Sequence, residues 1–226
     1  MYQFAQNAHL VNNFLQSSTK MPSEPKKPRR GRPREYDPER ALAEAMNVFW
    51  RNGYAATSLD DLSAATGLNR PSLYAGFGDK RELYLETLRR YREESRAAAQ
   101  KLLAEPMPLR EFLRRFYEVA LDFYFDAEER GRGCYSILSA ATQALVDPDV
   151  REFAAESIRA TDALLARQIK RARDQGEFFP SADPETLAQL ATATLHTLAV
   201  RSRAGATRER LTTLADGAIA IICADK

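Results

Sequence analysis

The sequence predicts an all-α protein with a small amino-terminal three-helix domain and a larger helical body. From residue 41 onward, apolar residues recur at intervals of three and four, which is the period of an amphipathic helix. No segment shows the alternation of apolar and polar residues that marks a half-buried strand. The chain has 226 residues, 44% of them hydrophobic and 28% charged, which suits one large domain or a large and a small one around a packed core.

Residues 1–35 differ from the rest and are expected to form a flexible tail that ends in a basic arm. Six basic residues and no acidic residue stand between positions 26 and 34, although the formal net charge of the whole chain is only +2. The intervening Gly31 and Pro33 prevent a helix, so Arg30, Arg32 and Arg34 would be presented on an extended strand that fits a DNA minor groove. The alternative is a solvated linker whose charge aids solubility.

Three helices are expected after this arm. The first starts at Asp37, runs for about four turns and stops at Gly53. The second covers residues 59–66, with Thr57 and Ser58 as caps and a glycine directly after it. The third begins with Arg70 and Pro71, because proline is tolerated in the first turn of a helix. Two short helices joined by a glycine-containing turn are the sequence form of a helix-turn-helix.

The third helix is the expected reader of a DNA major groove. Leu73 and Phe77 would anchor it on the first helix, since so short a helix is unstable alone. Asn69, Arg70 and Ser72 would then face outward. Arg70 can pair with a guanine or clamp a phosphate, and Asn69 can instead be used as the helix cap.

The segment TSLDDLSAATGLNRPSLYAGFGDKREL, residues 57–83, closely resembles the DNA-binding signature of TetR-family transcriptional regulators. The resemblance covers about residues 36–85, which become the helix-turn-helix domain, and leaves residues 86–226 as a helical regulatory and dimerisation domain. It implies a dimeric regulator, usually a repressor, that binds a palindromic DNA operator and is released by a small-molecule inducer or by an electrophile or oxidant. It also implies phosphate contacts from Thr57, Tyr74 and Lys80, and base or backbone contacts from Arg70 and Ser72. Gly76 departs from the family, which often has histidine there, so any phosphate contact of that histidine is absent.

Physical alternatives exist for these contacts. Lys80 lies in the first turn of the fourth helix, where exposed N–H groups already favour an anion. Tyr74 is either a phosphate contact or a core aromatic whose hydroxyl reaches solvent. Thr57 is a helix cap, with or without a phosphate contact, and Trp50 is expected to pack in the core.

The body is expected to contain six helices, over residues 79–103, 109–127, 134–145, 150–176, 184–203 and 207–224. The second of these is the most aromatic stretch of the chain. Its aromatic residues form either ordinary core, which the residues alone favour, or the wall of a ligand pocket, which the resemblance favours. The candidate lining residues are Phe112, Phe116, Tyr117, Phe123, Tyr124 and Tyr135.

The last two helices carry apolar stripes with small residues that permit close helix packing. These stripes predict a four-helix homodimer interface, and their alternative role is burial within one protomer. A palindromic operator read by one short helix per subunit requires a dimer, and the family dimerises in this way. The predicted interface consists of Leu187, Leu190, Ala191, Leu195, Leu198, Leu211, Leu214, Ala218, Ile221 and Ile222.

Cys134 follows Arg132 and Gly133 at an expected helix start, where the helix dipole and the arginine would stabilise a thiolate. This arrangement suggests that Cys134 is a thiol sensor of oxidants or electrophiles. The alternative is that Cys134 is a small buried residue of the core. A cysteine enzyme is not expected, because His196 is the one histidine in the folded body and lies in the interface stripe.

Other function classes have little support. Two cysteines and two histidines provide no zinc-ligand spacing, and neither a P-loop nor a GxGxxG pattern is present, so we expect no metal and no cofactor. The longest apolar run, residues 218–224, is too short to span a membrane, and no secretion signal is recognisable, which predicts a cytoplasmic protein. The remaining alternative is a nucleic-acid-binding protein without sequence specificity that uses the basic arm alone.

Overall fold

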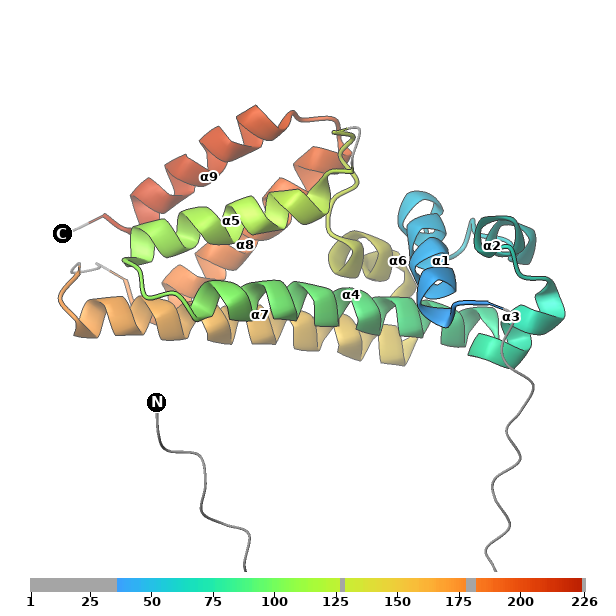
Figure 1. Ribbon diagram of the computed structural model, residues 1–226. Helices are drawn as coiled ribbons and strands as arrows, with labels where there is room; N and C mark the ends of the chain where they lie inside the picture. Colours follow the sequence, from blue (N-terminus) through green and yellow to red (C-terminus); the bar gives the residue numbers. More distant parts are fainter. Residues whose placement is uncertain (1–35, 127–128, 178–181, 225–226) are drawn as a thin grey trace, which may run out of the picture. The chain divides into compact units, whose positions relative to one another are not determined.

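The computed structural model describes residues 36–126, 129–177 and 182–224, and it confirms the all-α class (Figure 1). The described residues form nine α-helices, one π-helical turn and no strand. Residues 36–226 belong to one compact unit. The basic arm, with Arg30, Arg32 and Arg34, lies outside the described residues.

The head consists of α1 (Pro38–Asn52), α2 (Leu59–Thr66) and α3 (Arg70–Phe77). Each helix begins at a polar cap: the side chains of Asp37, Ser58 and Asn69 accept backbone N–H groups of the first turn. Ser58 also forms a reciprocal capping box with Asp61. Of the two residues expected to cap α2, Ser58 is the cap and Thr57 is not.

The core of the head differs from the expectation in one respect. Leu62 of α2 and Leu73 of α3 are buried beside Phe49 of α1, as amphipathic spacing requires. Phe77 is only half-buried, and its ring contacts Tyr36 with 6.3 Å between the ring centroids. The main neighbours of α3 are α2 and α4 (Lys80–Leu103), not α1, because α1 is already covered by α2 and α4.

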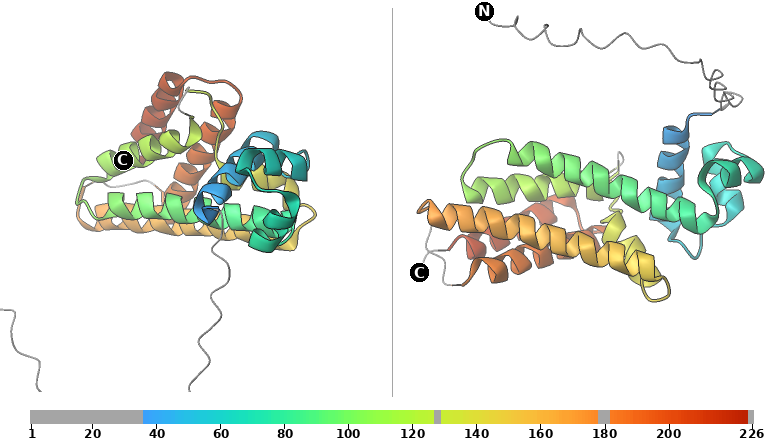
Figure 2. Two further views of the ribbon diagram at one scale, coloured as in Figure 1. Left: turned by 45° about the vertical axis from the view of Figure 1, so that its right-hand side comes forward. Right: turned by 90° about the horizontal axis from the view of Figure 1, so that it is seen from below.

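The two longest helices of the body are α4 (Lys80–Leu103) and α7 (Pro148–Asp174). On one side of them lie α5 (Leu109–Tyr124), α8 (Pro184–Arg203) and α9 (Arg208–Ile222), as Figure 2 shows. α7 packs along α8, α8 packs against α9, and α5 contacts both α8 and α9. The expected helix over 134–145 is split into a π-helical turn and the short α6. The elements of the body are α4 (Lys80–Leu103), α5 (Leu109–Tyr124), η1 (Tyr135–Ser139), α6 (Ala140–Gln143), α7 (Pro148–Asp174), α8 (Pro184–Arg203) and α9 (Arg208–Ile222).

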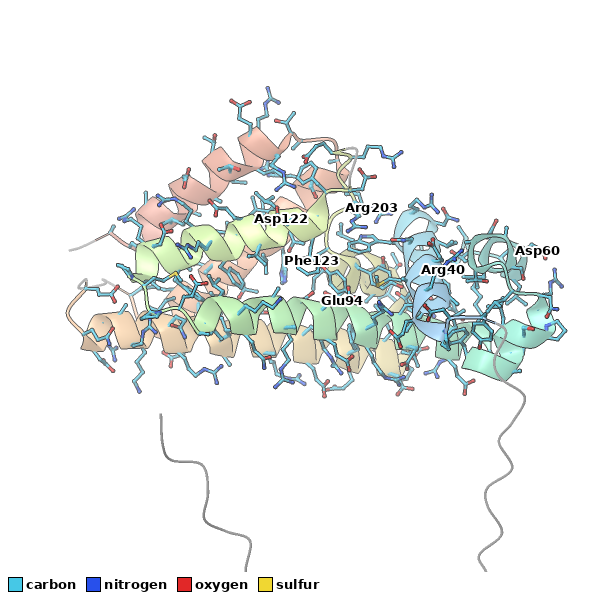
Figure 3. The ribbon with its side chains drawn as sticks, in the orientation of Figure 1. Arg40, Asp60, Glu94, Asp122, Phe123 and Arg203 are labelled. Carbon is cyan, nitrogen blue, oxygen red and sulfur yellow. The ribbon has the colours of Figure 1, made fainter. Side chains whose placement is uncertain are left out.

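The end of α1 is tied to the body by hydrogen bonds. The Trp50 indole N–H donates to the carbonyl oxygens of Arg132 and Gly133, at 3.1 and 3.2 Å. Arg203, at the end of α8, donates to the carbonyl oxygen of Trp50 at 3.1 Å (Figure 3). A side chain at Gly131 would collide with the backbone of Ser202, so the loop can lie this close only because it carries glycine. Trp50 is therefore a core residue, as expected, and it also joins α1 to α8.

A second tie joins the start of α4 to the start of α7. The Arg81 guanidinium donates to both carboxylate oxygens of Asp147, at 2.6 and 2.9 Å, and to Asp149 at 2.6 Å. The Asp147 side chain is buried, whereas that of Asp149 is 69% exposed. Hydrogen bonding from Arg81 holds the pKa of Asp147 below its usual range.

Asp147→Asn should destabilise the fold, because asparagine keeps the cap of α7 and loses the charge that pairs with Arg81. We expect a loss of about 1.5–3 kcal/mol in the free energy of unfolding at pH 7, the usual contribution of hydrogen bonds to a charged group. A depressed carboxyl pKa stabilises the fold above the ordinary carboxyl pKa, and this stabilisation is lost as the pH falls through the depressed value.

The difference between the native protein and Asp147→Asn should therefore shrink under acid conditions below about pH 4. Urea unfolding followed by circular dichroism measures both effects. Asp149→Asn is the matched control, since this exposed partner should contribute at most about 1 kcal/mol. Equal losses in the two variants would contradict the assignment.

Candidate nucleic-acid interface

The turn between α2 and α3 presents the start of α3 at the surface. Gly67 ends α2 in the left-handed conformation, with φ of 71°, which favours glycine. Asn69 and Arg70 are exposed, and Ser72 is half-buried. Asn69 and Arg70 therefore face outward as expected, and Ser72 does so only in part.

Asn69 has the capping role that the sequence left open. Its Oδ1 accepts the backbone N–H of Ser72 at 2.9 Å. The side-chain oxygen is thus used to start α3.

Arg70 forms a fork-shaped ion pair with Asp60 of α2. Its Nε donates to Oδ1 of Asp60 at 3.1 Å, and its Nη2 contacts Oδ1 and Oδ2 at 2.7 and 2.8 Å. The side chains of Arg70 and Asp60 are 55% and 75% exposed. Asp60 was not predicted as a partner of Arg70, because two residues that are ten positions apart on different helices share no periodic pattern in the sequence.

Tyr74 and Lys80 stand at the edge of this surface. Tyr74 is 49% exposed, so it is not the core aromatic that the sequence offered as an alternative. The Lys80 ammonium is half-buried and lies 4.4 Å from the centroid of the Tyr54 ring. Burial lowers the pKa of Lys80. Tyr74 on α3 thus offers an exposed side chain with a hydroxyl, and Lys80 at the start of α4 offers a partly desolvated ammonium.

Thr57 is placed differently from the other candidates. It is buried, and its hydroxyl donates to the carbonyl oxygen of Gly53 at 2.7 Å. Its side chain therefore closes the turn between α1 and α2 rather than facing solvent.

Gly76 lies against Tyr36. A Cβ atom at position 76 would meet the hydroxyl of the Tyr36 side chain, which would have to shift. The signal in the sequence was a glycine inside a helix, a position that alanine normally favours. A residue larger than glycine would displace Tyr36.

The six aromatic residues proposed to line a pocket do not form one group. Phe116 contacts the rings of Phe112 and Tyr117, at centroid distances of 6.1 and 5.8 Å. Phe123 and Tyr135 instead surround Tyr91, at 5.7 Å each. Phe116 and Phe123 are half-buried, and Phe112, Tyr117, Tyr124 and Tyr135 are buried.

Two further features lie outside the predicted site residues. A shallow, open hollow of about 480 Å³ lies on the head between α1 and α2, lined by Val48, Arg51, Asn52, Asp61, Ala64 and Ala65. In the body, buried polar side-chain atoms of five residues have no hydrogen-bond partner among the described residues: Ser139, Asp162, Gln168, Arg171 and Thr192.

Cys134 is buried among hydroxyl groups. Its sulfur lies 3.1 Å from Oγ of Ser136 and 3.5 Å from the hydroxyl of Tyr91. It precedes a π-helical turn of five residues. The Arg132 guanidinium lies 3.9 Å from the Trp50 ring centroid, and its Nε donates to the carbonyl oxygen of Phe123. The Arg132 guanidinium therefore already contacts the Trp50 ring and the Phe123 carbonyl oxygen.

The predicted interface residues divide between the two faces of α8 and α9. Leu190, Leu214 and Ile221 are 49%, 37% and 74% exposed, and Leu195 and Ala218 are half-buried. Val200, which the sequence analysis missed, is 52% exposed on α8. The other predicted residues are buried within the protomer: Leu187, Ala191, Leu198, Leu211 and Ile222. The apolar stripes of α8 and α9 are wide enough to include both buried and exposed residues. The sequence pattern therefore does not show which of these residues are exposed.

Among the described residues, no three side chains of histidine, cysteine, aspartate or glutamate gather where they could hold a metal ion. None of the helices in the described ranges combines the length and apolar character needed to cross a bilayer.

Comparison with known proteins gives consistent matches. The family model for bacterial regulatory proteins of the tetR family matches residues 41–87, and the model for a tetracyclin repressor-like C-terminal domain matches residues 109–217. The HTH-type transcriptional repressor ComR of Escherichia coli is 31% identical over 191 residues, covering 82% of this chain and 89% of ComR. The uncharacterized HTH-type regulator YezE of Bacillus subtilis is 37% identical over 148 residues, covering 65% of this chain and 75% of YezE.

Solved structures agree with these matches. A cysteine variant of the TetR family regulator CifR, in complex with a 26-bp operator duplex, superposes with a TM-score of 0.74 and 30% identity. The superposition covers 84% of this chain and 98% of CifR. The reduced form of NemR from E. coli, at 19% identity and a TM-score of 0.69, shares the fold.

Proposed function

This chain belongs to the TetR family of bacterial regulatory proteins and is a DNA-binding transcriptional regulator rather than an enzyme, and from this premise we propose that it is a homodimeric repressor of a palindromic operator. The observation that carries the proposal is the capped α3, which offers Arg70 and Tyr74 to solvent on a rigid frame. ComR and a second E. coli relative, BdcR, are both named as repressors, which supports repression. The proposed place of action is the cytoplasm, where bacterial operator DNA lies.

The proposed DNA contacts follow from exposure and charge. α3 enters the major groove with Arg70 and Ser72 toward bases or backbone, and Tyr74 and Lys80 contact phosphates. The basic arm, with Arg30, Arg32 and Arg34, is proposed for the adjacent minor groove. We assign Thr57 and Asn69 to the frame, because each side chain already closes a backbone turn.

Selection of bound fragments from random DNA should enrich one palindromic sequence. The double substitution Arg70→Ala and Tyr74→Phe should abolish this enrichment while leaving binding to unrelated DNA largely intact, because the arm remains. Deletion of residues 26–34 should instead weaken binding to all sequences alike and flatten its salt dependence. Absence of any enriched sequence with the native protein would overturn the regulator proposal and favour non-specific binding by the arm.

The homodimer is proposed to form through the exposed apolar face of α8 and α9. The large apolar side chains that α8 and α9 expose in one protomer are Leu190, Val200, Leu214 and Ile221, which are 49%, 52%, 37% and 74% exposed. Four such side chains on two adjacent helices support an interaction surface there. A two-fold axis through this face would form a four-helix contact between protomers.

Val200→Glu should convert the dimer into a folded monomer, since a charge would be buried within the contact. Analytical ultracentrifugation gives the molecular mass, and circular dichroism confirms that helix content is unchanged. Leu145→Glu is the matched control, because Leu145 is 78% exposed but lies between α6 and α7. A Val200→Glu protein that remains dimeric would contradict this interface.

The releasing signal is proposed to act on the body. The aromatic residues around α5 and the unpartnered polar atoms of Asp162, Gln168, Arg171 and Thr192 support a small-molecule inducer that carries hydrogen-bonding groups. Cys134 offers an alternative signal, an oxidant or electrophile. The CifR structure carries cysteine substitutions and the NemR structure is of a reduced form, which supports testing the thiol in this chain.

If Cys134 is the sensor, N-ethylmaleimide should release the native protein from its operator. Cys134→Ser should stay bound after the same treatment, and Cys223→Ser should respond like the native protein. Peptide mapping after iodoacetamide treatment measures the reactivity directly. Labelling of Cys134 no faster than a free peptide thiol at neutral pH would eliminate the thiol signal and leave the small-molecule inducer.

A further inference from the structure

We propose that Asp60 is a specificity-determining residue that orients Arg70 for a two-point contact with a guanine. This inference rests on the proposed function and deepens it, because it assigns a role to a residue of α2 outside the proposed set of DNA contacts. The observation behind it is the fork-shaped ion pair between these two side chains.

The geometry leaves one end of the guanidinium available. Asp60 takes the edge that carries Nε and Nη2, at distances between 2.7 and 3.1 Å. A guanidinium has five N–H donors in a rigid plane. Nη1 does not contact Asp60. On the edge that Nη1 shares with Nη2, one N–H of Nη1 and the second N–H of Nη2 form a parallel pair of donors, which matches the O6 and N7 acceptors of guanine.

Both partners are fixed to capped helix starts. Asp60 lies in the first turn of α2, held by the reciprocal Ser58 and Asp61 hydrogen bonds at 3.1 and 2.8 Å. Arg70 lies in the first turn of α3, which Asn69 caps. The pair therefore sets the direction of Arg70 from two backbones that the turn holds rigidly. Figure 3 shows Asp60 at the outer edge of the head, away from the body.

The charge of the pair also favours a base over a phosphate. A lone arginine is attracted to every phosphate, which gives affinity without sequence information. An adjacent carboxylate cancels most of that attraction and repels a phosphate brought close to the same arginine. The acceptors of a guanine edge carry no net charge, so the pair can bind them while Asp60 stays in place.

The same contact could instead hold Arg70 away from DNA in the free protein. In that case DNA would have to break the ion pair, and Asp60 would lower the affinity for every sequence to the same degree. The orienting role predicts a different result, because removal of Asp60 would affect mainly the base pair that Arg70 reads.

Asp60→Asn tests the proposal. Binding constants are measured by fluorescence anisotropy for the selected operator, for operators changed at one base pair at a time, and for unrelated DNA. We expect discrimination at one guanine position to fall about tenfold, within the usual range for a two-point arginine contact. Discrimination at the other positions should be unchanged, and affinity for unrelated DNA should be equal or higher.

Two controls separate this effect from folding and from net charge. Glu86→Gln removes another exposed carboxylate, one that pairs with Arg89 on α4, and it should leave the base preferences unchanged. In an Arg70→Ala background, Asp60→Asn should have no further effect on discrimination. Circular dichroism melting shows whether each variant is folded.

These experiments distinguish a failure of the role of Asp60 from a failure of the proposed function. Native protein that selects an operator, together with an Asp60→Asn variant that keeps the full base preference or gains affinity equally for all sequences, would overturn the role of Asp60 alone. Native protein that selects no sequence would overturn the proposed function, and the role of Asp60 with it.

Discussion

The reading surface depends on a constraint of length: α2 and α3 have eight residues each, too few to be stable as isolated helices. They persist because polar caps satisfy their first N–H groups and because Leu62 and Leu73 are buried against neighbouring helices. The side-chain oxygen of Asn69 caps α3, and the hydroxyl of Thr57 closes the turn before α2. The side chains of Arg70 and Tyr74 are exposed.

The head is not attached to the body through α4 alone. Trp50 and Arg203 join the end of α1 to the 131–133 loop and to α8, and Arg81 joins the start of α4 to the start of α7. Arg203 also supplies a cation to the carbonyl end of α1, where the helix dipole favours positive charge. A change in the body near Cys134 or α8 therefore has a direct hydrogen-bonded connection to the reading head. This connection gives a physical basis for a signal that acts on the body and changes DNA binding.

The body shows why aromatic content alone does not define a pocket. Phe112, Phe116 and Tyr117 pack on one another, whereas Tyr135 packs on Tyr91 and Trp50 near the head. The second group shares its position with the tie between α1 and the 131–133 loop. Part of the aromatic cluster thus stabilises the junction between head and body. The proposed inducer contacts must be sought among the remaining residues of α5, α7 and α8.

The sequence by itself determined the helical class, the helix-turn-helix and most helix ends. These follow from local chemistry: a cap such as Asn69 or a left-handed glycine such as Gly67 acts on residues within one turn. Only the tertiary structure decided the pairing of Asp60 with Arg70, the burial of Leu187 and Leu198, and the space that Tyr36 takes beside Gly76. Each of these depends on which faces of separate helices meet. Helical periodicity shows that a stripe is apolar, but the direction in which each residue of a wide stripe points is set by the packing of its neighbours.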